Sequence, residues 1–169
     1  IFSAYTEDDR HFLNGLLWKY EQDNFSVVAT DGRRLALAST DSVKIKKDFK
    51  IIVPSKILNE LIKFIKSAAI EEKEEVLVGL SSNQIGFKIA KTVFISRLIE
   101  GNFPAYEQII PKTKEFSVEI NTPKLVAVTK RAAIATNERS GAVKYTFKKG
   151  MLIVNSSSQT MDFEDELEV

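Results

Sequence analysis

The feature that most constrains the fold of this chain is a pattern that occurs twice along its 169 residues. Each copy has a short apolar segment, then an amphipathic helical pattern, then three segments with the composition of strands. The two helical patterns start roughly 66 residues apart, which indicates an internal repeat. We therefore predict an α+β fold of repeated βαβββ units, with the helices on one face of antiparallel sheets. Two unrelated α+β layers with a coincidental spacing are the alternative.

Two helices are expected, and a proline marks the start of each. The first follows Pro54 and extends from Ser55 to about Ser67, and the second follows Thr122 and Pro123 and extends to about Ala135. Their apolar residues recur every three or four positions, which predicts one buried face on each helix. These residues are Ile57, Leu58, Leu61, Ile62 and Ile65 in the first helix, and Leu125, Val126, Val128, Ala132 and Ile134 in the second.

Almost all of the remaining chain has the composition of strands. Turn-forming residues such as Asp31-Gly32 separate the segments. The expected strands cover residues 16–20, 25–30, 34–39, 51–53, 76–80, 84–90, 93–98, 116–120, 142–147, 151–156 and 161–169. Because the first three precede any helix, we expect the chain to begin inside one repeat unit and to end inside a larger two-unit domain.

The residue types present argue against catalysis. The chain has no Cys and one His, which excludes thiolate zinc sites, thiol nucleophiles and clusters of His ligands. The common nucleotide-binding, hydrolase and metalloprotease motifs do not occur. Acidic residues near the C-terminus alternate with Phe163 and Leu167, which is typical of an amphipathic strand. We therefore expect no enzyme, no cofactor and no metal; the opposing hypothesis is a hydrolase that uses His11 with Asp8 or Asp9.

Both expected helices carry basic residues away from their apolar ones. These are Lys56, Lys63 and Lys66 beside Asn59 in the first helix, and Lys124, Lys130 and Arg131 in the second. Since the chain has 24 basic and 23 acidic residues, a positive surface requires such clustering. A solvated face explains either set alone, whereas two related basic faces favour contact with a nucleic-acid backbone. Neither set contains aromatic residues, so we expect attraction to phosphates without base recognition.

Two segments are more specific than the rest of the chain. Residues 28–36 read VATDGRRLA, where a strand ends, turns, and a new strand begins after two arginines. Residues 96–106 read SRLIEGNFPAY, where a strand leads into a loop with proline and aromatic residues that we expect to be exposed. The plainer interpretations are a structural hairpin for the first segment and an interdomain linker for the second.

At these two segments the chain resembles the bacterial DNA polymerase III beta subunit, the sliding clamp. Residues 28–36 are similar to the family's VATDGHRLA stretch and residues 96–106 to its SRLIEGKFPDY stretch, with Ile110-Pro111 following. Further matches are FLNG at 12–15, IVP-x-K at 52–56 and AI-x-x-NE at 133–138. By this resemblance, residues 1–111 are the clamp middle domain without its N-terminal strand and helix, and residues 112–169 are the first half of the C-terminal domain.

The resemblance implies a function that composition alone does not. Members of the family close head to tail into a homodimeric ring around duplex DNA, with helices lining the hole, and they tether the replicative polymerase for processive synthesis. The implied partners are duplex DNA, the polymerase III catalytic subunit, the clamp loader and other proteins with a clamp-binding motif. The implied location is the cytoplasm, and no membrane partner is expected because the apolar runs are shorter than the ~20 residues of a membrane-spanning helix. The alternative is a scaffold of βαβββ units that binds proteins and not DNA.

The resemblance also implies site residues. Partner proteins would insert a short peptide into a pocket formed by Arg10, Thr30, Gly32, Arg33, Arg34, Leu35, Pro104 and Ile109. The basic helix faces would contact DNA, with weak further contacts at His11 and Phe12. The family often has His at the position of Arg33, and the other wall of the pocket is expected to come from a later part of the third domain.

Overall fold

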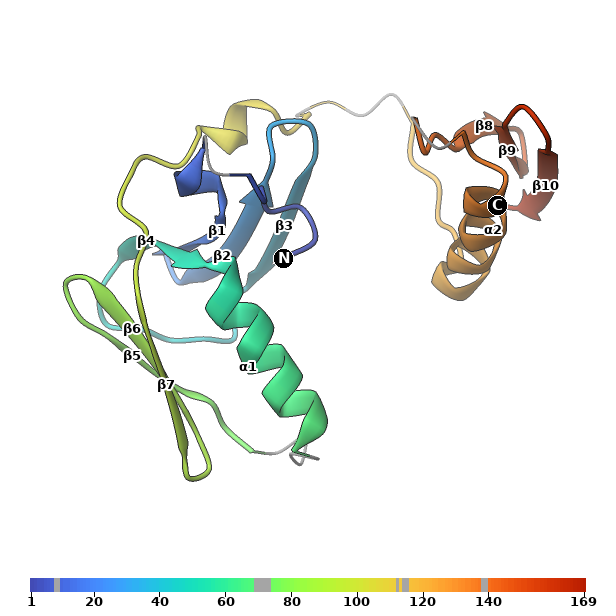
Figure 1. Cartoon of the computed structure of the whole chain (residues 1–169). Coiled ribbons are helices and arrows are strands. Elements are labelled where there is room, and N and C mark those ends of the chain that lie inside the picture. Colours follow the sequence, from blue (N-terminus) through green and yellow to red (C-terminus); the bar gives the residue numbers. More distant parts are fainter. Residues whose placement is uncertain (8–9, 69–73, 112, 114–115, 138–139) are drawn as a thin grey trace. The chain divides into compact units, whose positions relative to one another are not determined.

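The computed structural model describes residues 1–7, 10–68, 74–111, 113, 116–137 and 140–169. The chain forms two compact units, Ile1–Ile110 and Pro111–Val169 (Figure 1). Among the described residues, the model contains no helix that is both long and apolar enough to cross a membrane.

A four-stranded antiparallel sheet begins the first unit. It consists of β1 (Gly15–Glu21), β2 (Asn24–Thr30), β3 (Leu35–Thr40) and β4 (Phe49–Pro54), in the order β3-β2-β1-β4. Leu17 lies opposite Val28 on one neighbouring strand and Ile52 on the other, and all three side chains are buried. Because side chains alternate between the two faces of a strand, this burial fixes the register of the whole sheet.

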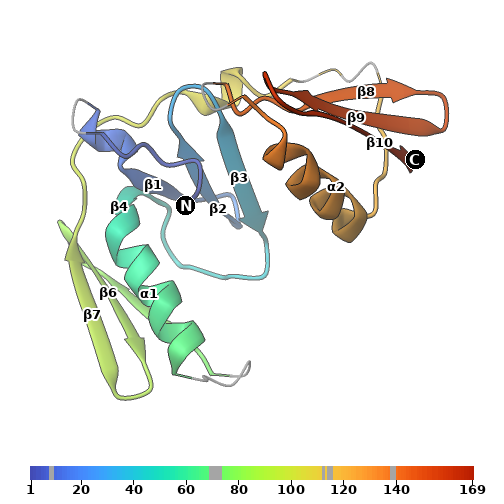
Figure 2. The ribbon, with the colours of Figure 1, turned by 45° about the vertical axis from the view of Figure 1, so that its right-hand side comes forward.

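The helix α1 (Ser55–Ser67) follows β4 directly, and a second antiparallel sheet follows the helix. This sheet consists of β5 (Leu77–Leu80), β6 (Gln84–Ile89) and β7 (Thr92–Arg97), in that order. In both views α1 runs alongside it (Figures 1 and 2). The main core of the unit joins the helix to both sheets and contains Ala4, Leu16, Ala29, Val53, Leu58, Leu61, Ile85, Phe87 and Ile89. Burial of each large apolar side chain stabilises the unit by roughly 1.5–3 kcal/mol.

A second cluster lies beside the first sheet and includes two short 3₁₀ helices, η1 (His11–Leu13) and η2 (Tyr106–Gln108). Its buried members are Leu13, Leu17, Val28, Ile52, Phe103 and Tyr106. The segment between β7 and η2 is tied to the sheet because the Ile99 N–H donates to the carbonyl of Ile52 at 2.9 Å. The segment that leaves β7 is therefore packed against the sheet.

The second unit repeats the plan of one helix and three strands. The helix α2 (Thr122–Ile134) precedes β8 (Lys144–Lys148), β9 (Met151–Ser157) and β10 (Asp162–Glu168), which pair in the order β10-β9-β8. Val128 and Ala132 of α2 are buried against Leu152 and Val154 of β9. The Asn121 side chain caps the helix by accepting the Lys124 N–H at 3.1 Å.

The α+β class and both helices are confirmed, and most expected strands lie within two residues of the observed ones. The expected strand at 116–120 is wrong, because these residues form no strand pairing and Phe116 is 68% exposed. In the first unit the equivalent strand, β4, pairs with β1 of the preceding three strands. Among the described strands of the second unit, no such partner exists, and an extended segment without a partner leaves its backbone groups to water.

Three smaller expectations are also corrected. The helix α2 was expected to follow Thr122 and Pro123, yet it includes both residues and its cap is Asn121. Val126 and Ile134 are 45% and 75% exposed, so the buried side of α2 is narrower than its apolar pattern suggests. Phe103 and Tyr106 were expected to be exposed, yet they are only 6% and 5% exposed because they close the second cluster beside the sheet.

Candidate functional site

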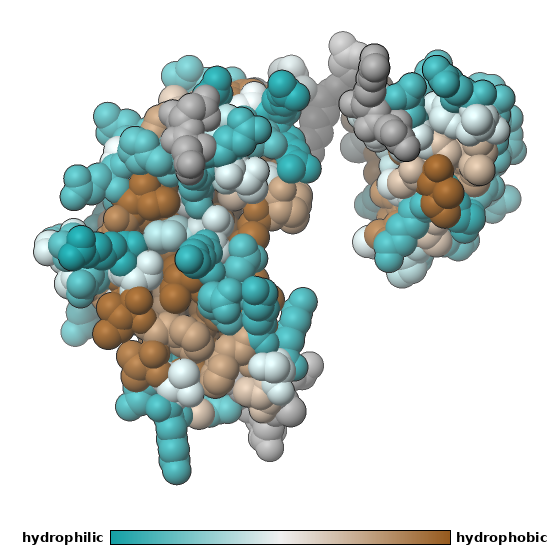
Figure 3. All heavy atoms as spheres, in the orientation of Figure 1, coloured by the Kyte–Doolittle hydropathy of each residue, from teal (hydrophilic) through white to brown (hydrophobic). Residues whose placement is uncertain are grey.

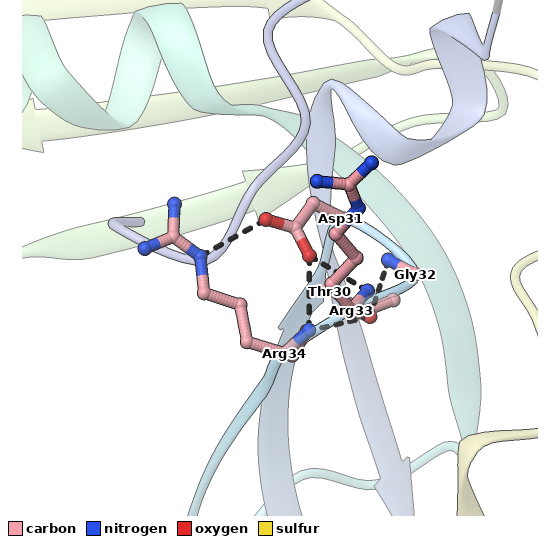
Figure 4. Close-up of polar contacts among 5 residues, drawn as sticks. All are labelled: Thr30, Asp31, Gly32, Arg33 and Arg34. Carbon is pink, nitrogen blue, oxygen red and sulfur yellow. Dashed lines mark hydrogen bonds and ion pairs between the residues drawn. The ribbon is translucent and has the colours of Figure 1, made fainter. Parts of the chain in front are cut away.

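The turn between β2 and β3 is held by its own side chains (Figure 4). Thr30 ends β2 and is 4% exposed. Its Oγ1 donates to the carbonyl of Arg34 at 2.8 Å and accepts the Gly32 N–H at 3.1 Å. A single hydroxyl therefore joins both sides of the turn, which fixes the direction in which residues 31–34 project.

The Asp31 carboxylate accepts a second set of hydrogen bonds that holds the turn. One carboxylate oxygen accepts the N–H groups of Arg33 and Arg34 at 2.9 and 3.0 Å, and the other accepts from Arg34 Nε at 2.9 Å. The backbone N–H of Arg33, then that of Arg34, and more weakly the Arg34 side chain lower the pKa of Asp31 from 3.8 to about 2. The turn is thus built around an ionised carboxylate.

Gly32 gives the turn a conformation that other residues rarely adopt, since its φ is +88°. A Cβ at this position would also lie 3.3 Å from Nη1 of Arg10. Arg10 itself places its guanidinium 6.0 Å from the centre of the Tyr5 ring. The turn and the segment before η1 therefore approach each other closely at Gly32.

The structure brings four of the eight expected pocket residues around one hollow of 670 Å³. Arg10, Gly32, Arg33 and Arg34 line it, together with residues of the 1–7 segment and Ser55 and Asn59 of α1. Polar surface dominates this hollow, because three arginines face it with Glu7 and Asp31. The hollow is suited to the polar part of a ligand.

The other four expected pocket residues lie outside this hollow. Thr30 is buried beneath the turn, and half-buried Leu35 packs against the second cluster, which contains Phe103 and Tyr106. Pro104 is half-buried, and its carbonyl accepts the Tyr106 N–H at 2.8 Å. Ile109, which directly follows η2, is 67% exposed. The apolar residues of the expected pocket thus lie in or near the segment 103–109. Phe103 and Tyr106 of this segment are buried, whereas Ile109 is open to solvent.

Leu35 packs against the second cluster, and three buried residues of that cluster outside the four-stranded sheet were not among the expected site residues. These are Leu13, Phe103 and Tyr106, all members of the second cluster. The sequence indicated them, because Phe103 and Tyr106 lie within two residues of Pro104 and Leu13 lies in the FLNG match. Burial raises the pKa of the Tyr106 phenol, and Glu107 next to it lies 3.6 Å from Nζ of Lys19.

The basic face expected on α1 is present. Lys56, Asn59, Lys63 and Lys66 are all exposed, on the side of α1 opposite to buried Leu58 and Leu61. Lys63 pairs with Glu60 of the same helix, with Nζ 3.0 Å from Oε1. The i, i+3 pair is exposed and contributes little to stability.

The basic face expected on α2 is smaller than its sequence suggests. Lys124 and Lys130 are exposed, as expected. Arg131 instead forms an ion pair with Asp165 of β10, and its hydrogen bond is the main cause that lowers the pKa of that carboxyl. Arg131 lies three residues after buried Val128, so it borders the buried side of the helix and its side chain reaches β10.

His11 and Phe12 lie in η1, where the exposed His11 ring meets the Phe12 ring edge-on at 5.9 Å. Asp8 and Asp9, which the hydrolase hypothesis needs, fall outside the described residues. Within the described part of the chain, no group of three His, Cys, Asp or Glu residues is placed to hold a metal ion. The acidic strand β10 alternates as expected, with Asp162, Glu164, Glu166 and Glu168 exposed.

Comparison with known proteins identifies the family. Residues 1–105 match the central domain of the DNA polymerase III beta subunit, and the chain therefore belongs to this family. The chain is 30% identical to the beta sliding clamp of Haemophilus influenzae over 166 residues, which are 98% of this chain and 44% of that protein. It is also 30% identical to the beta sliding clamp of Bacillus subtilis over 160 residues, 94% of this chain and 41% of the relative.

Solved structures agree with the family assignment. A sliding clamp from Pseudomonas aeruginosa bound to griselimycin superposes with a TM-score of 0.84 at 28% identity. The match covers 99% of this chain and 45% of the Pseudomonas chain. A putative beta subunit from Eubacterium rectale superposes with a TM-score of 0.87 at 25% identity, with the same coverage. The fold is therefore that of the sliding clamps, and the chain spans less than half the length of these relatives.

Proposed function

We propose that this chain is part of a DNA sliding clamp, which encircles duplex DNA as a homodimeric ring and tethers the replicative polymerase for processive synthesis. The observation that carries the proposal is the similarity to beta sliding clamps over 98% of the chain. The protein would act by binding, without a reaction of its own. Its partners would be duplex DNA, the polymerase III catalytic subunit, the clamp loader and other proteins with a clamp-binding motif.

Within this clamp, residues 1–111 would be most of the middle domain and residues 112–169 the first half of the C-terminal domain. The match of residues 1–105 to the central domain supports the first assignment. The second unit supports the other assignment, because it leaves several large apolar side chains exposed that the second half of a domain would cover. These are Phe116, Val118, Val126, Ile134, Tyr145 and Phe147.

DNA would meet the exposed basic face of α1, where the Lys63–Glu60 pair is itself open to solvent, with Lys124 and Lys130 of α2 as the corresponding contacts in the second unit. Lysine ammonium groups attract phosphates wherever they lie along the duplex. Such contacts carry no sequence information, which is what a protein that slides requires. Arg131 is not included in this proposed face, because Asp165 already binds it. His11 and Phe12 would remain weak contacts near η1.

The peptide pocket would combine an apolar part and a polar rim. Leu35, Pro104 and Ile109 would bury an apolar side chain of the partner, and the turn from Thr30 to Arg34 would contact the peptide backbone. The exposure of Ile109 supports this assignment, since a large apolar side chain next to a firmly packed segment offers area for a ligand to cover.

The pocket can be tested by measuring the affinity of the full-length protein for a short labelled clamp-binding peptide. We expect Leu35→Lys to reduce the affinity at least about tenfold, because it places a charge where an apolar side chain would be buried. Pro104→Ala should also weaken binding, while the exposed Lys47→Ala serves as a control that should not. Unchanged affinity in both Leu35→Lys and Pro104→Ala, with folding intact, would refute the pocket assignment.

A further inference from the structure

The outer face of the β5–β6–β7 sheet, away from the core, carries exposed apolar side chains. Leu77, Val93 and Ile95 are 59%, 57% and 67% exposed. Phe94, between the last two, points the other way and meets the ring of Phe64 on α1 at 5.3 Å. The solvent face of an antiparallel sheet is usually polar, so apolar residues on both faces of β7 are unusual. Figure 3 shows apolar surface gathered over this sheet.

Two glycines, Gly79 and Gly86, leave the middle of this face without side chains, and we call this flat area the glycine floor. The register places Gly79 opposite Gly86, and Gly86 opposite Ile95. A Cβ at Gly79 would meet nothing within 4 Å, and one at Gly86 would meet only backbone oxygens at 3.8 and 4.0 Å. The space above the two glycines is therefore open, with the Ile95 side chain at its side. It offers room for one large apolar side chain.

Two cations flank the floor along the strand direction. Lys88 lies opposite Val93, and Arg97 is four residues further along β7 on the same face. Both are exposed, and the strands β5, β6 and β7 contain no Asp or Glu. The acidic residues nearest in sequence, Glu75 and Glu100, lie outside the strands. The two cations are roughly 13 Å apart along β7, at about 3.3 Å per residue.

An extended peptide has a matching periodicity. Its side chains at positions i, i+2 and i+4 point to one side, and the outer two are also about 13 Å apart. Acidic residues at i and i+4 would therefore reach Lys88 and Arg97 while an apolar residue at i+2 covers the glycine floor against Ile95. Charge and spacing together specify the occupant.

We propose that this sheet face, defined by Leu77, Gly79, Gly86, Lys88, Val93, Ile95 and Arg97, binds an extended segment of a partner protein with the pattern acid–x–apolar–x–acid. The surface is separate from the turn at residues 30–34, and it does not depend on the proposed clamp function. It gives the chain a second protein-binding surface. This surface is the outer face of the β5–β6–β7 sheet, whereas the first lies at the turn between β2 and β3.

The test uses a labelled seven-residue peptide with aspartate at its second and sixth positions, leucine at its fourth and serine elsewhere. Fluorescence anisotropy measures its binding to the full-length protein, and isoleucine-methyl NMR locates it. We expect saturable binding that shifts the Ile95 methyl signal. Ile95→Thr, which keeps the β-branched shape, and Arg97→Glu should each weaken binding at least about tenfold. A peptide with lysine in place of both aspartates should not bind.

Lys46→Glu is the matched control, because it reverses an exposed charge in the loop between β3 and β4 and should leave the affinity unchanged. Absence of binding up to about 1 mM peptide, or affinity insensitive to Ile95→Thr and Arg97→Glu, would overturn the proposal. Self-association that Ile95→Thr abolishes would also overturn it, since a second copy would then be the occupant. Binding of the clamp peptide at the 30–34 turn is measured in the same variants, so that a failure here is distinguishable from a failure of the proposed function.

Discussion

Asp31 shows how one side chain prepares the β2–β3 turn for a ligand. Its carboxylate accepts three hydrogen bonds from Arg33 and Arg34, while Thr30 Oγ1 joins the two sides of the turn. A turn that is ordered before binding loses less entropy when a ligand arrives. Asp31 is thus a positioning residue for the proposed site, and its ionisation state reports whether the turn is formed.

The low pKa of Asp31 predicts a pH dependence of this turn. Since the folded pKa is about 2 and the ordinary value is 3.8, the ionised carboxylate stabilises the turn fully above pH 3.8. That contribution is lost as the pH falls from 3.8 towards 2. A carbon-detected NMR titration of the Asp31 carboxyl between pH 6 and 1 measures the midpoint.

Arg34→Met separates the effect of the backbone N–H groups on the Asp31 pKa from the effect of the Arg34 side chain. The backbone N–H groups of Arg33 and Arg34 are the main causes and remain in the variant, so the midpoint should stay well below 3.8. A midpoint near 3.8 in the unmodified protein would mean that the carboxylate does not accept these bonds in solution.

At the scale of elements, the turn of the β1–β2 hairpin contains uncommon residues for its backbone conformation. Glu21 pairs with Asn24, so the loop has two residues, and Gln22 and Asp23 have φ values of +52° and +60°. Such a turn favours Asn followed by Gly, because other residues are strained at positive φ. The backbone strain at Asp23 is partly compensated, because its Oδ1 accepts a hydrogen bond from the Tyr20 hydroxyl at 2.9 Å.

Gln22→Asn should therefore stabilise the protein by about 0.5 kcal/mol. Asp23→Gly should give no such gain, because it removes the bond from Tyr20 while it relieves the backbone. Urea unfolding followed by the fluorescence of Trp18, the only tryptophan, measures both. Trp18 is a suitable probe because its ring contacts those of Phe25 and Phe87, at 5.3 and 5.9 Å. A loss of stability in Gln22→Asn would contradict this account of the turn.

The same scale shows what local sequence can and cannot predict. The helix α1 has the bounds expected from Pro54 and its apolar spacing, because both signals are local. The missing strand at 116–120 and the burial of Phe103 and Tyr106 depend on distant partners, which local composition does not report. Arg131 is a similar case, since its partner Asp165 lies 34 residues away. The turn at residues 30–34 was predictable from its motif, because a turn depends on residues close together in the sequence.

At the scale of the whole molecule, the basic face of α1 predicts how DNA binding responds to salt. Each phosphate neutralised by a lysine contributes roughly 0.9 to the slope of log affinity against log salt concentration. Reversing Lys56, Lys63 and Lys66 to Glu in the full-length protein should lower this slope by about 3. The slope is measured from DNA affinities at several KCl concentrations.

The matched control reverses Lys44, Lys46 and Lys47 to Glu, which changes the net charge equally in the loop between β3 and β4. This control should alter the slope much less, because the loop is not part of the basic helix face. Equal slopes in the two triple variants would mean that overall charge, and not the α1 face, determines the attraction.

Encirclement of DNA is the central claim, and retention on circular against linear DNA tests it most directly. The full-length protein is loaded by its clamp loader onto a nicked circular plasmid and separated from free protein by gel filtration. The proposed function predicts that the protein stays on the circle and is lost when a restriction enzyme opens it, because a ring slides off a free end. Equal retention on both forms, or no retention on the circle, would contradict encirclement and favour a scaffold that binds proteins alone.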